Sequence, residues 1–158
     1  MATLLHPDHF PRLFELSEAL RSDPSPCSYC NLNLERAVDW LEDRNRIDLV
    51  TLLDGVVTGI ASLQQGERHQ HHLGEISVAI HPDHRRSGSA GVLIGEIESR
   101  ASDVGVNIIK AMIWVENHPS RKLFESLGYE HKATLMAEFK SETFGEIDDA
   151  VYYKRLTI

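Results

Sequence analysis

The sequence is poor in cysteine and in positive charge, and each shortage excludes a class of protein. Two cysteines among 158 residues are too few for a small secreted domain built on disulfides. Lys and Arg number 16 against 24 Asp and Glu, which gives a formal net charge of −8 at pH 7. This acidic balance argues against nucleic acid as a partner, because phosphate contacts need a basic surface. Apolar runs near the roughly 18 residues of a membrane span are also missing, so a membrane partner is not expected.

The two cysteines, Cys27 and Cys30, stand in a C-x-x-C arrangement that can be a redox couple or half of a zinc site. Zinc would need two more ligands, and the sequence has no second cysteine pair. A redox pair is expected at the start of a helix after a strand, whereas this pair follows the Ser-Asp-Pro-Ser-Pro segment 22–26. In the cluster from His69 to His72, adjacent side chains point apart on extended chain, a poor geometry for one ion. We therefore expect free thiols in a loop, a polar histidine loop and no metal.

Length and composition predict the general class of the protein. A chain of 158 residues fits one domain spanning 1–158. The segment 1–10 lacks the basic region and apolar stretch of a secretory signal, so a cytoplasmic location is expected. An acidic surface mildly attracts cationic substrates such as amines, although acidity also serves solubility in many proteins.

Hydrophobic spacing predicts two helices in the first third of the chain. Asp8 can cap the first, whose apolar residues recur every three to four positions. These residues are Leu13, Leu16 and Leu20. The segment 22–26 is expected to end this helix, because it contains two prolines. The second helix, over 34–43, carries Leu34, Val38 and Leu41 on one face.

Strands dominate the rest of the chain, with two helices between them. The expected strands cover 47–53, 56–63, 73–80, 107–115, 129–139 and 150–158. A tight Asp54-Gly55 turn joins the first two. A helix over 88–103 has an apolar stripe that is expected to be buried, formed by Leu93, Ile97, Ala101 and Val104. Asn117 caps a short helix that ends at Leu127, and the whole order predicts an α/β or α+β sandwich around one sheet.

After the third expected strand, a turn rich in small residues leads into a helix. Gly88, Ala90 and Gly91 leave the first amides of the helix uncovered, so an anionic oxygen can approach several N–H donors at once. The helix dipole adds to this attraction, and Arg85 and Arg86 supply countercharge. The turn therefore fits a pyrophosphate group.

Other interpretations of this turn remain open. A dinucleotide-binding fold would place G-x-G-x-x-G after its first strand, and this turn lies mid-chain without that pattern. A nucleoside triphosphate loop would end in Gly-Lys-Ser/Thr, which the turn lacks. A tight strand-to-helix turn whose small residues serve packing alone is the third alternative.

Two segments of the chain contain motifs with a characteristic spacing. Arg85-x-x-Gly88-x-Ala90 is similar to the Q/R-x-x-G-x-G/A signature of the GNAT family of N-acetyltransferases, which holds the pyrophosphate of coenzyme A in that family. The segment 117–129, Asn-His-Pro-Ser-Arg-Lys-Leu-Phe-Glu-Ser-Leu-Gly-Tyr, resembles the family's N-x-x-(A/S)-x-x-L-(Y/F)-x-x-L-G-(F/Y) motif. One helix and one strand separate the two motifs, as in the family, and Asp54-Gly55-x-x-x-Gly59 resembles its early hairpin. The similarity covers about 47–156 and is closest in character to members that act on small amines and amino acids.

The resemblance implies the acyl-CoA N-acyltransferase fold, a three-layer α/β (α+β) sandwich with about four helices and a mixed, mostly antiparallel sheet of six to seven strands. Strands 73–80 and 107–115 would splay apart, and the pantetheine arm of acetyl-CoA would enter the gap. A splayed strand has unpaired backbone groups on that side, which suits the amides of this arm. The implied cofactor-binding residues are Val78, Ala79, Ile80, Arg85, Arg86, Ser87, Gly88, Ser89, Ala90, Gly91, Asn117, Ser120 and Phe124.

Two positions bear on acetyl transfer itself. Many family members place a tyrosine in the second motif to protonate the departing sulfur, and here that position is Phe124, which has no proton to donate. Ser120 and ordered water are weaker alternatives for this role. Glu75 is the candidate base, because Leu73-Gly74-Glu75 resembles the Gly-Glu start of this strand in members that act on small amines. A solvated surface carboxylate is the alternative interpretation of Glu75.

The resemblance implies an acetyl-CoA-dependent N-acetyltransferase that works by direct attack of a small-molecule primary amine. The segment 138–153 loosely resembles the K-x-G-x-x-x-D-x-x-x-M ending of amino-acid and small-amine acetyltransferases. Neither cysteine lies in the motif region, which disfavours a cysteine intermediate. Two other functions remain open: a protein N-terminal or lysine acetyltransferase, and an acyl-CoA sensor that has lost catalysis because of Phe124. A homodimeric assembly is also open.

Overall fold

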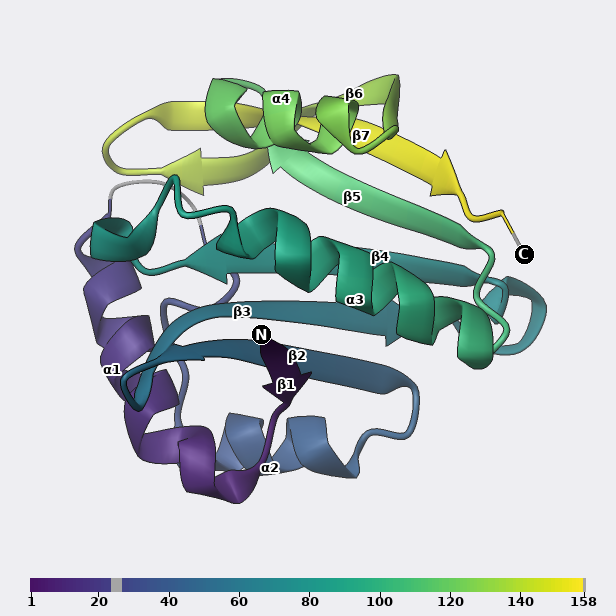
Figure 1. Ribbon diagram of the computed structural model, residues 1–158. Coiled ribbons are helices and arrows are strands. Elements are labelled where there is room, and N and C mark those ends of the chain that lie inside the picture. Colours follow the sequence, from purple (N-terminus) through teal and green to yellow (C-terminus); the bar gives the residue numbers. More distant parts are fainter. Residues whose placement is uncertain (24–26, 158) are drawn as a thin grey trace.

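One sheet of seven strands forms the centre of the protein (Figure 1). The computed structural model describes residues 1–23 and 27–157. Across the sheet the strand order is β1-β2-β3-β4-β5-β7-β6. The strands are β1 Ala2–Leu4, β2 Arg46–Leu53, β3 Val56–Gln65, β4 Leu73–Ile80, β5 Ile108–Trp114, β6 Glu130–Ser141 and β7 Gly145–Arg155. Among these strands β4 and β5 are parallel and the other neighbours antiparallel, which confirms the mixed, mostly antiparallel sheet.

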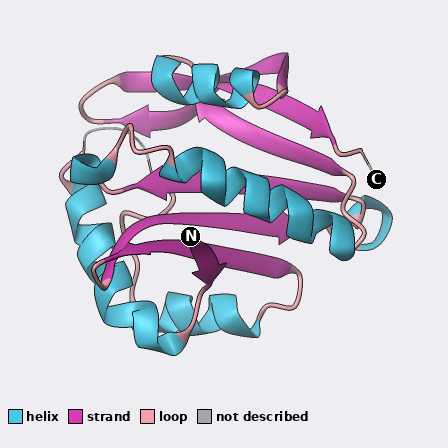
Figure 2. Cartoon of the chain, viewed as in Figure 1, coloured by secondary structure: helices cyan, strands magenta, loops and turns pink. Residues whose placement is uncertain are grey.

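Helices cover both faces of this sheet, which gives the expected three layers (Figure 2). They are α1 Phe10–Arg21, α2 Leu34–Glu42, α3 Ser89–Asp103 and α4 His118–Ser126, with short 3-10 turns at Pro7–His9, Arg68–Gln70 and Pro82–His84. Because side chains alternate along a strand, the neighbours Leu49 and Val50 on β2 enter different cores. Leu49 packs in the core of α3 and α4, and Val50 packs in the core of α1 and α2.

The parallel strands β4 and β5 separate towards their ends. Their pairing joins 73–76 to 108–111, whereas β4 continues to Ile80 and β5 to Trp114. Beyond Ile76, β4 still pairs with β3, so the edge that opens is the one facing β5. Figure 1 shows the two strands diverging. This fork confirms the splayed central strands of the expected fold.

The first hairpin and its packing against α3 follow from local sequence. Asp54 and Gly55 both have positive φ, 50° and 77°, as a two-residue hairpin turn requires. Gly59 on β3 lies where a Cβ would come within 2.6 Å of Ile80 and 3.1 Å of Leu93. A larger residue at this position would therefore displace the side chains of Ile80 and Leu93.

Several local predictions are wrong at the ends of elements. Asp8 does not cap the first helix. Instead the side chain of His6 accepts a hydrogen bond from the Asp8 amide and opens a 3-10 turn that leads into α1. Val104, expected in the buried stripe of α3, is the C-cap of that helix and is 48% exposed. β7 begins at Gly145 rather than at 150, because β6 runs on to Ser141 and a short turn returns the chain.

The apolar face of α2 points outward. Leu34, Val38 and Leu41 share one face as expected, but all three side chains are exposed. Ala37 is fully buried instead, and the ring of Trp40 meets the ring of Tyr29 edge-on, with 5.9 Å between centroids. Periodicity therefore predicts this helix correctly but does not predict which side is buried.

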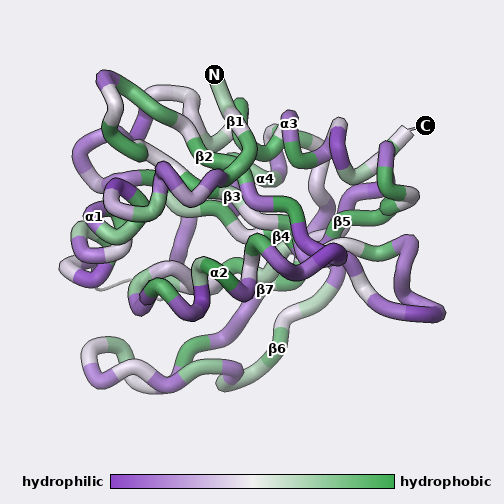
Figure 3. The backbone as a smooth tube through the Cα atoms, turned by 90° about the horizontal axis from the view of Figure 1, so that it is seen from below, coloured by the Kyte–Doolittle hydropathy of each residue, from purple (hydrophilic) through white to green (hydrophobic). Residues whose placement is uncertain are grey.

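Within the described residues, no helix is both long enough and apolar enough to cross a membrane. α1 ends at Arg21, and Ser22 is its C-cap. Positions 24–26 of the predicted helix-ending segment and position 158 of the last predicted strand lie outside the described residues. The hairpin of β6 and β7 projects from the body of the molecule in Figure 3. It exposes the apolar side chains Met136, Phe139 and Phe144.

Candidate active site

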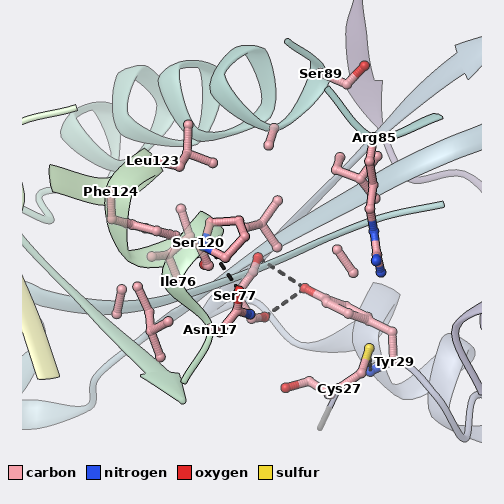
Figure 4. Close-up of a pocket in the computed structure, with 18 of the residues that line it drawn as sticks. Cys27, Tyr29, Ile76, Ser77, Arg85, Ser89, Asn117, Ser120, Leu123 and Phe124 are labelled. Atoms are coloured by element: carbon pink, nitrogen blue, oxygen red, sulfur yellow. Dashed lines mark hydrogen bonds between the residues drawn. The ribbon is translucent and has the colours of Figure 1, made fainter. Parts of the chain in front are cut away.

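A cavity of about 650 Å³ occupies the fork between β4 and β5. Its walls come from the two diverging strands, the turn that opens α3, the helix α4 and the segment after α1 (Figure 4). Every residue implied for cofactor binding lines this cavity, namely 78–80, 85–91, Asn117, Ser120 and Phe124. Two motifs that lie far apart in the sequence therefore meet around one space.

The turn that opens α3 leaves room for an anion. Gly88, the N-cap, has a φ of 81°, a left-handed conformation that favours glycine. A Cβ at Gly88 or Gly91 would meet nothing within 4 Å, so open space lies beside the first turn of the helix. The hydroxyl of Ser87 donates a hydrogen bond to the carbonyl oxygen of His84, at 2.7 Å, and steadies the turn. Helix amides that face open space are suited to a phosphate group.

Arg85 connects this turn to the N-terminal part of the chain. Its guanidinium forms an ion pair with Asp23, which follows α1 and also lines the cavity. Arg86, the second arginine predicted to supply countercharge, has a φ of 60° and lines the same cavity. Positive charge therefore lies at the turn, with part of it shared with Asp23.

The helix α4 forms the wall opposite the turn. Asn117 caps it as predicted, since its Oδ1 accepts a hydrogen bond from the Ser120 amide at 3.2 Å. Phe124 is only 2% exposed, and its ring packs edge-to-face against Tyr129 with 4.8 Å between centroids. Because phenylalanine carries no hydroxyl, this position gives the cavity an apolar surface where a tyrosine would give a proton donor.

Glu75 lines a smaller pocket of about 180 Å³ beside the cavity. It lies on the same side of β4 as Ser77, which lines both spaces. The Glu75 carboxylate is half exposed and lies 2.5 Å from Nζ of Lys110 on β5. Arg36 and Arg46 line the same pocket. The pocket therefore presents charges of both signs next to the fork.

Tyr29 is a cavity residue that sequence reasoning missed. Its side chain is buried, and its hydroxyl lies 2.6 Å from Oγ of Ser77 and 2.9 Å from Oγ of Ser62. Burial raises the pKa of Tyr29 to about 12. Ser17 on α1 donates a hydrogen bond to the Tyr29 carbonyl oxygen at 2.6 Å and holds this segment against the sheet. No local motif marks Tyr29, because its partner Ser77 lies 48 positions away.

Cys27 lines the cavity beside Tyr29 (Figure 4). Cys27 and Cys30 are free thiols, as expected. Burial raises the pKa of Cys27 to about 12, so its thiol stays protonated at neutral pH and is a poor nucleophile. In the part of the chain that the structure describes, no three His, Cys, Asp or Glu side chains are grouped to hold a metal ion.

Comparison with known proteins gives a consistent result. The sequence model of the acetyltransferase (GNAT) family matches residues 13–129, more than half of the chain. The chain is 32% identical over 103 residues to the L-amino acid N-acyltransferase MnaT of Escherichia coli. That match covers 62% of this chain and only 60% of the length of MnaT.

Solved structures share the fold over nearly the whole chain. The ribosomal-protein-alanine N-acetyltransferase of Brucella melitensis matches with a TM-score of 0.87 and 26% identity, over 99% of each chain. The structure of yncA from Salmonella typhimurium with its cofactor acetyl-CoA matches with a TM-score of 0.85 and 22% identity, over 100% of this chain and 94% of that one. The motifs, the fork and the family match agree, and the chain belongs to the acetyltransferase (GNAT) family.

Proposed function

We propose that this protein transfers the acetyl group of acetyl-CoA to the primary amine of a small molecule. One observation carries the proposal: a single cavity joins an uncovered helix N-terminus to an open strand edge. The helix N-terminus suits a pyrophosphate, and the strand edge suits an arm that contains amides. Membership of the family supports this chemistry, and yncA is a protein of the same fold whose structure contains acetyl-CoA.

The proposed binding of acetyl-CoA divides its parts among the walls of the cavity. The amides of 89–91 would bind the pyrophosphate, with Arg85 and Arg86 as countercharge. The backbone of 78–80, open on the β5 side, would pair with the pantetheine amides. The wall formed by α4, with Asn117, Ser120 and Phe124, would close the other side of the pantetheine arm.

Acetyl transfer needs a neutral amine, and an alkylammonium ion has a pKa near ~10, so a proton acceptor is required. Glu75 is the proposed acceptor, because its carboxylate lies beside the fork and lines the adjoining pocket. The amine nitrogen bonds to the thioester carbon, the carbon–sulfur bond breaks, and coenzyme A leaves as a thiolate. Since Phe124 has no proton to give, the thiolate takes one from solvent, with Ser120 as the weaker alternative donor.

An amine that also carries a carboxylate fits the smaller pocket best. Guanidinium groups bind carboxylates well, and Arg36 and Arg46 line the pocket, Arg46 while also paired with the Asp48 carboxylate; Glu75 would attract the ammonium end. The L-amino acid acceptor in the name of MnaT supports this choice. The likeness to a ribosomal-protein-alanine N-acetyltransferase favours a second candidate, the N-terminus of a protein.

The proposal is tested by offering the purified protein acetyl-CoA with a panel of amines and measuring thiol release. The panel contains amino acids, amino acid amides, polyamines and peptides with N-terminal alanine. We expect release with free amino acids and much less with their amides, which lack the carboxylate. Release with the peptides alone would favour the second candidate. Tight binding of acetyl-CoA without release for any amine would overturn both and leave an acyl-CoA sensor.

A further inference from the structure

Four side chains form a continuous series of hydrogen bonds from the cavity to a buried carboxylate. Oγ of Ser77 lies 2.6 Å from the Tyr29 hydroxyl, which lies 2.9 Å from Oγ of Ser62. Ser62 in turn donates a hydrogen bond to the carboxylate of Asp48. Ser77 lines the cavity one residue beyond the last pair of β4 with β5, while Ser62 and Asp48 are buried. The series therefore runs from the apex of the fork into the interior (Figure 4 shows its first step).

The carboxylate sets the direction of these hydrogen bonds. Ionised Asp48 can only accept, so Ser62 donates to it. Ser62 then accepts from Tyr29, and Tyr29 accepts from Ser77. The Tyr29 hydroxyl has a second acceptor in the Ser77 carbonyl, but that contact is longer, at 3.1 Å. With its own proton directed inward, the Ser77 oxygen keeps lone pairs with which to accept a proton from a molecule in the cavity.

We infer that Ser77, Tyr29 and Ser62 relay to Asp48 the second proton of the acceptor amine, which the nitrogen loses as it bonds to the thioester carbon, whereas Glu75 takes the first proton from the ammonium ion. This inference rests on the acetyl transfer proposed above. As the nitrogen bonds to the thioester carbon, its proton moves to Ser77. The proton of Ser77 moves to Tyr29, that of Tyr29 to Ser62, and that of Ser62 to Asp48. Each hydroxyl loses one proton and gains one. The carbon–sulfur bond breaks with its electron pair on sulfur, and the thiolate takes a proton from solvent.

Asp48 is suited to the end of such a relay. Burial raises the pKa of its carboxyl, against the opposing effects of Arg46 and Ser62, and a raised pKa makes a carboxylate a better proton acceptor. Nε of Arg46 lies 2.9 Å from the carboxylate, and Asp43 is a further acidic group that acts on it. Arg46 and Ser62 both line the smaller pocket, as does Glu75 on β4, so the inner end of the series lies beside that pocket.

The relay is tested with Tyr29→Phe, which keeps the ring and removes the hydroxyl. At pH 7 we expect kcat to fall about 10²-fold while the KM for acetyl-CoA stays unchanged. The loss should shrink as the pH approaches ~10, because hydroxide can then take the proton that the interrupted relay no longer carries. Ser62→Ala interrupts the next step of the relay and should give the same pH-dependent loss. An acetyl-CoA-induced rise in melting temperature verifies that each variant still folds and binds.

Thr58→Val is the matched control, since Thr58 is also a buried hydroxyl between β2 and β3, bonded to Thr51 rather than to the relay. It should change kcat by the same small factor at every pH. A pH-independent loss in Tyr29→Phe, or no loss, would overturn the relay while leaving acetyl transfer intact. Absence of thiol release by the wild-type protein with every amine would overturn the proposed function, and the relay with it.

Discussion

Glu75 on β4 and Lys110 on β5 are direct partners in the parallel register, and their side chains form an ion pair of 2.5 Å. The pair lies in the last stretch where the two strands still run side by side, just before the fork opens. The lysine therefore holds the Glu75 carboxylate next to the smaller pocket, where an acceptor amine would enter.

Replacing Glu75 by glutamine should leave acetyl-CoA binding intact and lower turnover by about 10²-fold, because the shape stays while the proton acceptor is lost. The measurement is thiol release across the pH range with the best amine of the panel. Glu130→Gln is the control, since Glu130 is also a strand carboxylate paired with a lysine, Lys132, but lies on the exposed edge strand β6. Equal turnover in the wild type and Glu75→Gln would show that Glu75 is a surface carboxylate and not the proton acceptor.

Gly88→Val should abolish the rise in melting temperature that acetyl-CoA causes. The side chain would enter the open space beside the first turn of α3, where the pyrophosphate is proposed to bind. Gly105→Val is a close control, because Gly105 also has a left-handed φ, 82° against 81°, and open space for a Cβ, but lies past the far end of α3. Both variants should lose similar intrinsic stability, about 1–2 kcal/mol. A ligand-induced shift that survives in Gly88→Val contradicts the assignment.

Phe124→Tyr should be tolerated and should raise turnover, by up to about tenfold. Phe124 lines the cavity, so an added hydroxyl can point towards the sulfur of the thioester and protonate the leaving thiolate. The comparison uses wild type and variant with the same amine panel. If neither protein releases thiol although both bind acetyl-CoA tightly, the protein is a sensor rather than an enzyme.

Alkylation of Cys27 should be slow at pH 8, by about 10³-fold relative to an unperturbed thiol, because a pKa of about 12 leaves little thiolate. The rate should rise about tenfold for each pH unit above that. Acetyl-CoA should slow it further, since Cys27 lines the cavity. Mass spectrometry of the Cys30→Ser variant isolates the reaction at Cys27. If Cys27 is alkylated rapidly and at the same rate with and without acetyl-CoA, its thiol lies outside the binding site.

Asp149→Asn should raise the melting temperature at pH 7. Burial raises the pKa of the Asp149 carboxyl, and Glu138 and Glu75 add to the effect. A raised pKa in the folded state means that the stability linked to this group is present at low pH and is lost as the pH rises through that pKa. The advantage of the variant over the wild type should therefore vanish as the pH falls towards about 3. This is below the ordinary aspartate pKa of about 4, so the side chain at position 149 is then neutral in both proteins. Asp148→Asn makes the same change at the exposed neighbouring position and serves as the comparison.

Local signals account for the parts of the site that the sequence could predict. The glycine turn at Gly88, the Asn117 cap and the Asp54-Gly55 hairpin each depend on residues within a few positions, and the structure has all three. The family motifs then predict that the Gly88 turn and the Asn117 cap border the same site, which hydrophobic periodicity alone does not predict.

The N-terminal segment could not be predicted in the same way. Tyr29 reaches the cavity through Ser77 and Ser62, partners 48 and 33 positions away, so no window of sequence contains the interaction. The outward apolar face of α2 is a similar case, because Ala37 and Trp40 pack inward at helical spacing while the larger stripe of Leu34, Val38 and Leu41 has the same spacing and is exposed.

The fork also has a mechanical consequence for the sheet. Among the described residues, strand pairing between the block of β1 to β4 and the block of β5, β7 and β6 is limited to four residue pairs, from Leu73–Ile108 to Ile76–Ala111. The sheet is thus two ribbons joined by a short seam. A ligand that pairs with the backbone of 78–80, as proposed for acetyl-CoA, would lengthen this connection from within and act as an extra strand between the two blocks.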